Sequence, residues 1–179
     1  MLSYDTLSLD GDMLDEAKAY LRLETDDDDG PLAAIMLAAI GHAESYTRQI
    51  LIQRSIRETL SASGRWQALS ASPVLSIDGV TGIPADGAAF AVPTANYAAD
   101  INGDGTAHFR VMQQGAAGRI EISYTAGLAI GWATLPEALR LGILRLIGHF
   151  YAHRDVPDDA GPPAAVAALL RPWRRITLS

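Results

Sequence analysis

The most informative stretch of the sequence is Pro136–Arg154, PEALRLGILRLIGHFYAHR. Its large apolar residues recur at steps of three and four, which places them on one face of an α-helix: Leu135, Leu139, Ile143, Leu146, Ile147 and Phe150. Pro136 suits the first turn, where a helix leaves its N–H groups unpaired. Because Leu141, Leu144 and Tyr151 widen the apolar surface, we expect this helix to be buried on several sides and to form the hydrophobic centre.

Two further helices are predicted upstream of this stretch. Asp10–Leu23 carries an apolar stripe at helical spacing, and Pro31–Leu51 repeats the same spacing with many small residues. Small residues allow close approach, so we expect the second of these helices to pack against Pro136–Arg154. Between the two lies Glu24–Gly30, ETDDDDG, whose four consecutive aspartates repel one another. We expect this run to be a solvated loop.

The middle of the chain changes to the period of extended strands. In Ile52–Leu60, the side chains of Ile52, Ile56 and Leu60 are expected on one side of a strand, with Arg54 and Glu58 between them. Further strands, or brief pairing, are predicted at Ser72–Val80, Asn96–Ala99, Ala107–Met112 and Arg119–Tyr124. Short strands with glycine-rich turns predict a small antiparallel sheet inserted between two helical segments.

These patterns predict a mainly α fold with a β insertion, an α+β arrangement. We expect a helical core of about three long helices, a small antiparallel sheet between helices two and three, a short C-terminal helix at Ala164–Leu170, and an extended tail. The predicted organisation is a single domain over residues 1–179. Its helical core comprises residues 10–51 and 135–170, its β insertion residues 52–124, and its C-terminal tail residues 171–179.

Composition limits the classes of protein that the chain can belong to. Hydrophobic residues make up 49% and charged residues 20% of the 179, which is ordinary for a globular protein. No run of 18 apolar residues is present, so we expect no membrane span. The first residues lack the basic and apolar regions of a signal peptide, so none is expected. The absence of cysteine excludes disulfides, Cys-ligated zinc and thiol catalysis.

The net charge of −7 is unevenly distributed. Residues 1–30 contain ten acids but only Lys18 and Arg22 as bases, and the remaining residues carry a balance of +1. The last nine residues, RPWRRITLS, contain three arginines and no acid. This distribution fits charged contacts with different neighbours, and it also fits a solvated acidic face with a frayed basic end.

Three patterns are partly like metal sites, and each lacks something that a site needs. Asp100–Gly105, DINGDG, opens like a calcium loop, but Val111 stands where the bidentate glutamate belongs, which favours a hairpin turn. His149 and His153 share a helix face, but Phe150 replaces the glutamate of a metalloprotease motif. The aspartate run has no rigid turn to converge its oxygens.

No nucleophile elbow, phosphate-binding loop or dinucleotide-binding motif is present in the sequence. We therefore predict no catalytic residues, no cofactor and no metal, and we expect the protein not to be an enzyme. A metal-binding module stays open as the least favoured alternative. The basic residues also lack the dense pattern of a nucleic-acid groove.

Four segments of the chain carry recognisable motifs in a fixed order: Asp15–Thr47, Ser72–Ile83, Arg119–Leu128 and Leu135–Asp155. The first contains an Ala-Lys-x-x-Leu-Arg helix, an acidic loop and an Ala-rich helix ending in Glu-x-Tyr-Thr, and the third contains a strand ending in Tyr-Thr-Ala-Gly. The last contains Gly-His followed by two aromatic residues near the end of its helix. Taken in order, these segments resemble the head–tail connector, or adaptor, family of tailed phages and gene transfer agents.

This resemblance implies a structural protein that forms a homo-oligomeric ring, of twelve copies, in the neck of a virion or phage-like particle. The ring would lie below the portal protein, extend the DNA channel and dock a tail-side neck or stopper protein. DNA would pass through without sequence-specific binding, and assembly would take place in the bacterial cytoplasm. Another neck or head-completion protein of similar design is the alternative. The resemblance does not distinguish an infectious phage from a gene transfer agent.

The C-terminal tail, Arg171–Ser179, is the predicted partner-binding segment. It combines large apolar and arginine side chains, which are the types that dominate binding hot spots. The resemblance supplies the portal as the partner, so we predict a tail that is mobile in the free protein and ordered on the portal. In the alternative, Trp173 folds back on the protein's own core. The predicted binding residues are Arg171, Trp173, Arg174, Arg175, Ile176 and Leu178.

Overall fold

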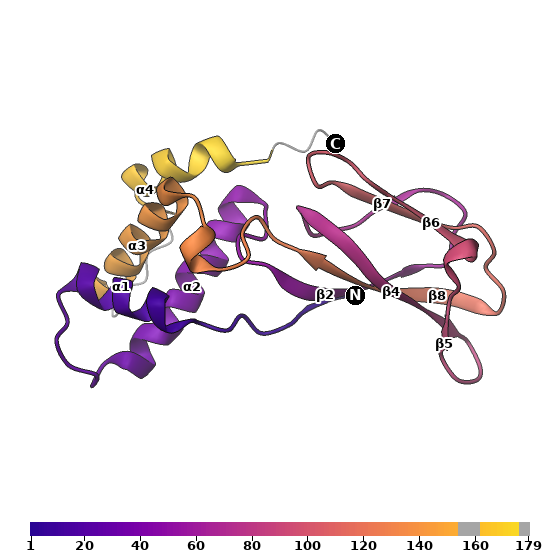
Figure 1. Cartoon of the computed structure of the whole chain (residues 1–179), viewed down its shortest axis with the longest axis horizontal. Helices are drawn as coiled ribbons and strands as arrows, with labels where there is room; N and C mark the ends of the chain where they lie inside the picture. Colours follow the sequence, from indigo (N-terminus) through magenta and orange to yellow (C-terminus); the bar gives the residue numbers. More distant parts are fainter. Residues whose placement is uncertain (154–161, 176–179) are drawn as a thin grey trace. The chain divides into compact units, whose positions relative to one another are not determined.

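The computed structural model describes residues 1–153 and 162–175 (Figure 1). The chain divides into two compact units. A β unit is formed by residues 1–6 and 53–128, and a helical unit by residues 7–52 and 129–179.

The helical unit is built around its third helix. In the described residues it contains four α-helices: α1 (Gly11–Leu21), α2 (Asp29–Thr47), α3 (Glu137–Ala152) and α4 (Ala164–Leu170). Two 3₁₀ turns, η2 (Trp132–Thr134) and η3 (Arg171–Trp173), precede α3 and follow α4. Helix α3 contacts each of the other three helices. None of the helices in the described part of the chain is long and apolar enough to cross a membrane.

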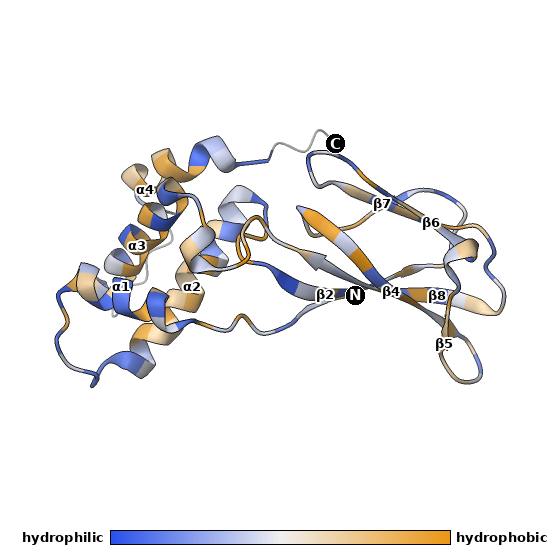
Figure 2. Ribbon diagram, in the orientation of Figure 1, coloured by the Kyte–Doolittle hydropathy of each residue, from blue (hydrophilic) through white to orange (hydrophobic). Residues whose placement is uncertain are grey.

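The apolar face predicted for α3 is buried as expected. Leu139, Ile143, Leu146 and Ile147 have no exposed surface (0%). Figure 2 shows the hydrophobic residues along α2 and α3, and the hydrophilic loop that joins α1 to α2. A Cβ atom on Gly142 would lie 3.0 Å from Cδ2 of Leu170, so the absence of a side chain at this position lets α4 approach α3 closely.

Helices α1 and α2 end earlier than the sequence predicted. Arg22 and Arg48, which follow them, have left-handed backbone conformations with φ of 59° and 56°. This conformation ends a helix and is usually taken by glycine. Arginine is not a sequence signal for the end of a helix as glycine is, so the predicted helix extends to Leu51.

The β unit contains two antiparallel sheets. The five-stranded sheet has the order β1 (Leu2–Tyr4), β2 (Arg54–Ser61), β8 (Ala117–Ala126), β4 (Val74–Pro84) and β5 (Phe90–Ala91). The three-stranded sheet has the order β3 (Gln67–Ala68), β7 (Ala107–Val111) and β6 (Tyr97–Ile101). A 3₁₀ turn, η1 (Thr94–Asn96), precedes β6.

The mainly α fold class with one small sheet is wrong. Eight strands in two sheets occupy the described residues alongside helices that are mostly short, so neither a core of three long helices nor a single small sheet describes the fold. The strands β1, β3 and β5 are only two or three residues long and carry too few residues to show a period of two. The prediction therefore missed these three strands. It included the regions of β6 and β7 but placed them in one small sheet, and so missed that they form a second sheet with β3.

Alternation along the strands builds the core of the β unit. In β8, Ile120, Ile122 and Tyr124 are completely buried, and the residues between them are more exposed. In β7, Ala107, Phe109 and Val111 are buried in the same way. At the end of β8, Gly127 has a φ of 151°, and a Cβ atom there would lie 2.4 Å from Cα of Gln53. Only glycine fits this position.

Glu58 is a buried charged residue of this core. Residues two apart in a strand share a face, so Glu58 points inward with Ile56. Its Oε2 atom accepts hydrogen bonds from the hydroxyl of Tyr124 at 2.8 Å and from the amide of Ser70 at 3.0 Å. The carboxylate, only 3% exposed, thereby ties the loop at Ser70 to both β2 and β8.

Replacing Leu146 by alanine should show whether α3 is the centre of the helical unit. Truncation of a buried leucine costs about 2–5 kcal/mol in the free energy of unfolding. Leu141 lies on the same helix but is 38% exposed, so Leu141→Ala should cost much less. Urea denaturation of the two variants gives the comparison. A loss below about 0.5 kcal/mol for Leu146→Ala would contradict the central role of α3.

Tyr124→Phe should change how stability depends on alkaline pH. Burial raises the pKa of Tyr124 above its ordinary value of 10.0, and the negative charge of Glu58 raises it further. The unfolded chain then ionises first, so this tyrosine's contribution to stability is complete below pH 10 and declines above it. At pH 11 the wild type should have lost more stability than Tyr124→Phe, by an amount on the order of 1 kcal/mol. If the stability of the wild type and of Tyr124→Phe changed equally from pH 8 to 11, the pKa of Tyr124 would not be raised in the folded protein.

Candidate assembly surfaces

The calcium-like sequence forms a hairpin turn, as the sequence analysis favoured. It joins β6 to β7, and the amide of Gly105 donates to the carbonyl of Asn102 at 2.8 Å. The amide and hydroxyl of Thr106 donate to the two carboxylate oxygens of Asp104, at 2.9 and 2.8 Å. The oxygens of Asp104 therefore fix the turn itself.

His149, in the last turn of α3, interacts with His153, which follows the helix. Their ring centroids are 4.5 Å apart, and Nδ1 of His153 lies 2.9 Å from the carbonyl oxygen of His149. No group of three or more His, Asp or Glu side chains that could hold a metal ion occurs in residues 1–153 and 162–175.

The aspartate run is partly neutralised inside the helical unit. The ammonium of Lys18 binds Asp26 and also binds Asp29, at 2.9 Å. These hydrogen bonds raise the pKa of Lys18 and lower the pKa of Asp26. Asp28 accepts a hydrogen bond of 2.6 Å from the hydroxyl of Tyr151, at the end of α3.

The prediction of a fully solvated loop is therefore only partly right. Asp28 and Asp29 are half-buried, and α2 begins at Asp29 rather than at Pro31. The carboxyl groups of Glu24, Asp26 and Asp27 lie on the exposed part of the loop. They leave an acidic surface at this end of the helical unit.

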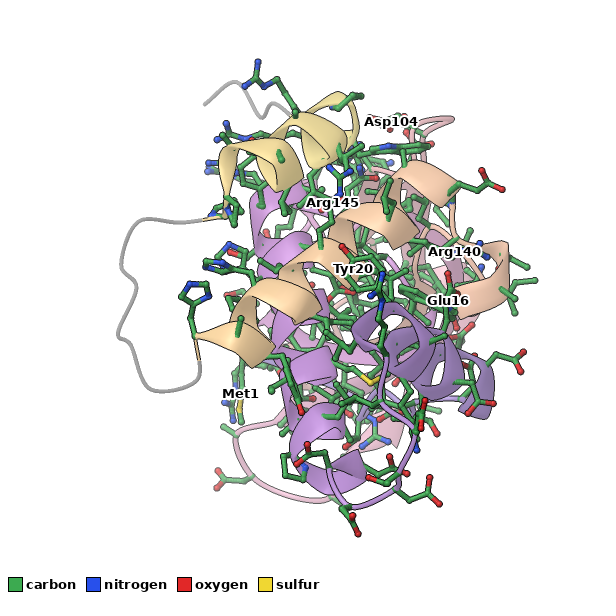
Figure 3. The ribbon with its side chains drawn as sticks, turned by 90° about the vertical axis from the view of Figure 1, so that its left-hand side faces the viewer. Met1, Glu16, Tyr20, Asp104, Arg140 and Arg145 are labelled. Atoms are coloured by element: carbon green, nitrogen blue, oxygen red, sulfur yellow. The ribbon has the colours of Figure 1, made fainter. Side chains whose placement is uncertain are left out.

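A second polar contact fixes α1 against the start of α3. The indole N–H of Trp132, a buried residue of η2, donates to Oε2 of Glu16 at 2.6 Å. The other oxygen of Glu16 lies 3.8 Å from Nε of Arg140, and Figure 3 labels both of these residues. Sequence reasoning missed this contact, because no periodic pattern links Trp132 to Glu16.

The described part of the predicted binding tail packs on the end of α2. The amide of Arg175 donates to the carbonyl of Thr47 at 2.9 Å. The side-chain amide of Gln49 donates to the carbonyl of Trp173. The guanidinium of Arg174 lies over the ring of Tyr46, 5.6 Å from its centroid.

These contacts have a clear physical role, because the last carbonyls of a helix have no partner within it. Arg175 satisfies one of them. Trp173 is half-buried and Arg171 is exposed. Ile176 and Leu178 lie outside the described residues. The structure thus brings part of the predicted tail together with α2, and partner binding by the six residues stays a prediction.

Exposed apolar residues mark other surfaces that sequence reasoning did not identify. On the β unit, Trp66 is 47% exposed and Met112 52%. On the helical unit, Ile130 is 77% exposed. No periodic pattern surrounds Trp66, so its exposed position could not be predicted from the sequence.

The comparisons with known proteins point to one kind of particle. No protein-family model matches the sequence, and the curated proteins give no match. Among solved structures, a chain in the neck of an empty gene transfer agent (GTA) particle, determined with C6 symmetry, has a TM-score of 0.80 and 27% identity. A chain in the neck of the native GTA particle, determined with C12 symmetry, has a TM-score of 0.75 and 27% identity.

A chain from the virion of the native GTA particle has a TM-score of 0.75 and 28% identity. All three alignments cover 100% of this chain and 97% of the other chain. The chain is therefore similar, over its whole length, to a neck component of a phage-like particle.

Shortening the chain should reveal how much the tail contributes to the free protein. Deleting residues 172–179 removes the contacts with Thr47, Gln49 and Tyr46, so the free energy of unfolding should fall by about 1–2 kcal/mol. Deleting only residues 176–179 leaves those contacts in place and serves as the control. Denaturant unfolding of both shortened chains measures the difference. Equal stabilities would show that the segment's contacts with α2 contribute nothing.

Proposed function

We propose that this protein is a structural connector in the neck of a phage-like particle. It forms a homo-oligomeric ring of twelve copies below the portal, extends the DNA channel and docks the tail-side neck component. The observation that carries the proposal is the full-length similarity to a GTA neck chain, with a TM-score of 0.80. The four sequence segments that resemble head–tail adaptors support it independently.

The symmetry of the similar particles supports a ring. Their necks were determined with C6 and with C12 symmetry. A twelvefold ring also contains a sixfold axis, so twelve copies are compatible with both. Subunits of such a ring meet head-to-tail, through two different patches that close on themselves.

The C-terminal segment is the proposed portal-binding element. The carbonyl of Trp173 accepts a hydrogen bond from the side chain of Gln49, and the amide of Arg175 donates to the carbonyl of Thr47, so the main chain of this segment is anchored at the end of α2. Arg171 is exposed just before this anchor, and the guanidinium of Arg174 lies over Tyr46. Arginine forms paired hydrogen bonds with carboxylates, so an acidic surface on the portal is the expected partner.

A charge reversal in this segment tests the portal contact in particles. Arg171→Glu should leave the protein folded, because the residue is exposed, but should reduce its loading onto portals. The affected particles should then lose DNA or fail to join tails. Arg145→Glu makes the same change of charge at an exposed position of α3 and is the control. Loading is measured from the amount of this protein per particle.

Two results would contradict the proposal at different levels. If both Arg171→Glu and the chain lacking residues 172–179 loaded onto portals normally, the C-terminal segment would not be the portal-binding element. Imaging of labelled particles would test the connector itself. Finding the protein dispersed in the particle without rotational symmetry, or absent from the neck, would show that it is not a neck connector.

A further inference from the structure

The three-stranded sheet presents a surface that the proposed function does not use. We call it the Trp66 face, and it consists of Trp66, Ala68, His108 and Arg110. In β7, His108 and Arg110 alternate with the buried Ala107, Phe109 and Val111, so both lie on the outer side of the sheet. The guanidinium of Arg110 stacks on the ring of Trp66, 4.6 Å from its centroid.

The loop that carries Trp66 is held firmly in place. The carbonyl of Ser63 accepts a hydrogen bond of 2.8 Å from the amide of Val111, and its hydroxyl accepts one of 3.1 Å from the amide of Arg65. The side chain of Gln67 donates to the carbonyl of Ser61 at 3.0 Å. A side chain that is fixed before binding loses little conformational entropy on binding, so this exposed tryptophan is prepared for a partner.

The chemistry of the Trp66 face selects an acidic partner. Nε of Arg110 is shielded from water and has no hydrogen-bond partner among the described residues. A guanidinium stacked on an aromatic ring keeps its in-plane N–H groups free to bind carboxylates. His108 lies two residues from Arg110 on the same side of β7, and Asp100 of β6 stands opposite His108. Tryptophan and arginine together are typical of the centres of protein interfaces.

We propose that the Trp66 face binds the acidic loop, Glu24–Asp29, of a neighbouring copy of this chain. The loop carries five carboxyl groups, and those of Glu24, Asp26 and Asp27 lie on its exposed part. Lys18 compensates one of the five charges. The two surfaces are different and complementary in charge, which is what a head-to-tail ring contact requires. The inference rests on the proposed ring and identifies its contacting patches.

The absence of cysteine from the chain allows a clean cross-linking test. Thr25 and Ala68 are exposed, one in the acidic loop and one on the Trp66 face, so Thr25→Cys and Ala68→Cys can be combined in one chain. Particles containing this variant are treated with a short bismaleimide cross-linker and analysed on a denaturing gel. The expected result is a ladder of covalent multimers of this chain.

Matched variants make the result specific. Ser45→Cys with Ala68→Cys places the first cysteine at an exposed position of α2 outside the loop, and it should give no ladder. Adding Arg110→Glu to the Thr25 and Ala68 pair should reduce the multimers at least about tenfold, because it opposes like charges at an interface centre.

The outcomes separate this inference from the proposed function. If the protein is present in the neck but the Thr25 and Ala68 pair gives no multimers, the inference is wrong and the connector role stands. Cross-linking to a different particle protein would also overturn it, since it would make that protein the partner of the face. If particles lack the protein altogether, the proposed function itself fails.

Discussion

Helix α3 has to bury apolar side chains on several sides at once, and the helical unit is arranged to satisfy this requirement. Burial of a large aliphatic side chain stabilises a fold by about 1.5–3 kcal/mol, so several on one helix outweigh any single polar contact in the unit. Close packing of this kind needs gaps in the helix surface. Gly142 provides one for Leu170, and a Cβ atom on Gly148 would lie 3.2 Å from the ring of Tyr20. The positions of α1 and α4 therefore follow from glycines in α3.

Long regular patterns could be read from the sequence, and local exceptions could not. The apolar spacing of α3 and the alternation of β8 identified both elements, because each has enough residues to establish a period. The shortest strands have no period, and the left-handed arginines that end two helices have no special composition. The burial of Glu58 could not be predicted for a different reason. Its hydrogen bonds come from Ser70 and Tyr124, which are distant in sequence.

The candidate surfaces were predictable only where composition was unusual. The arginines and tryptophan of the C-terminal segment stand out in the sequence, but their backbone bonds to α2 depend on how the helices pack. The acidic first thirty residues also stand out, and yet no pattern shows which of their charges are used internally. The stacking of Arg110 on Trp66 joins residues more than forty positions apart. A single sequence contains no signal for such a pair.

The way the acids of residues 1–30 are used has a consequence for assembly. Glu16 accepts a hydrogen bond from Trp132, Asp28 accepts one from Tyr151, and Asp29 binds Lys18. These carboxylates hold the helices together, and their negative charge is partly compensated within the subunit. The charge that a partner can detect comes from the exposed acids of the same loop. Such exposed charges act over roughly 8–10 Å at physiological salt, so they steer subunits and set their orientation more than they add affinity. Lasting attachment then needs apolar or stacked groups next to the charges. A fixed tryptophan with an arginine over its ring supplies such groups on the β unit.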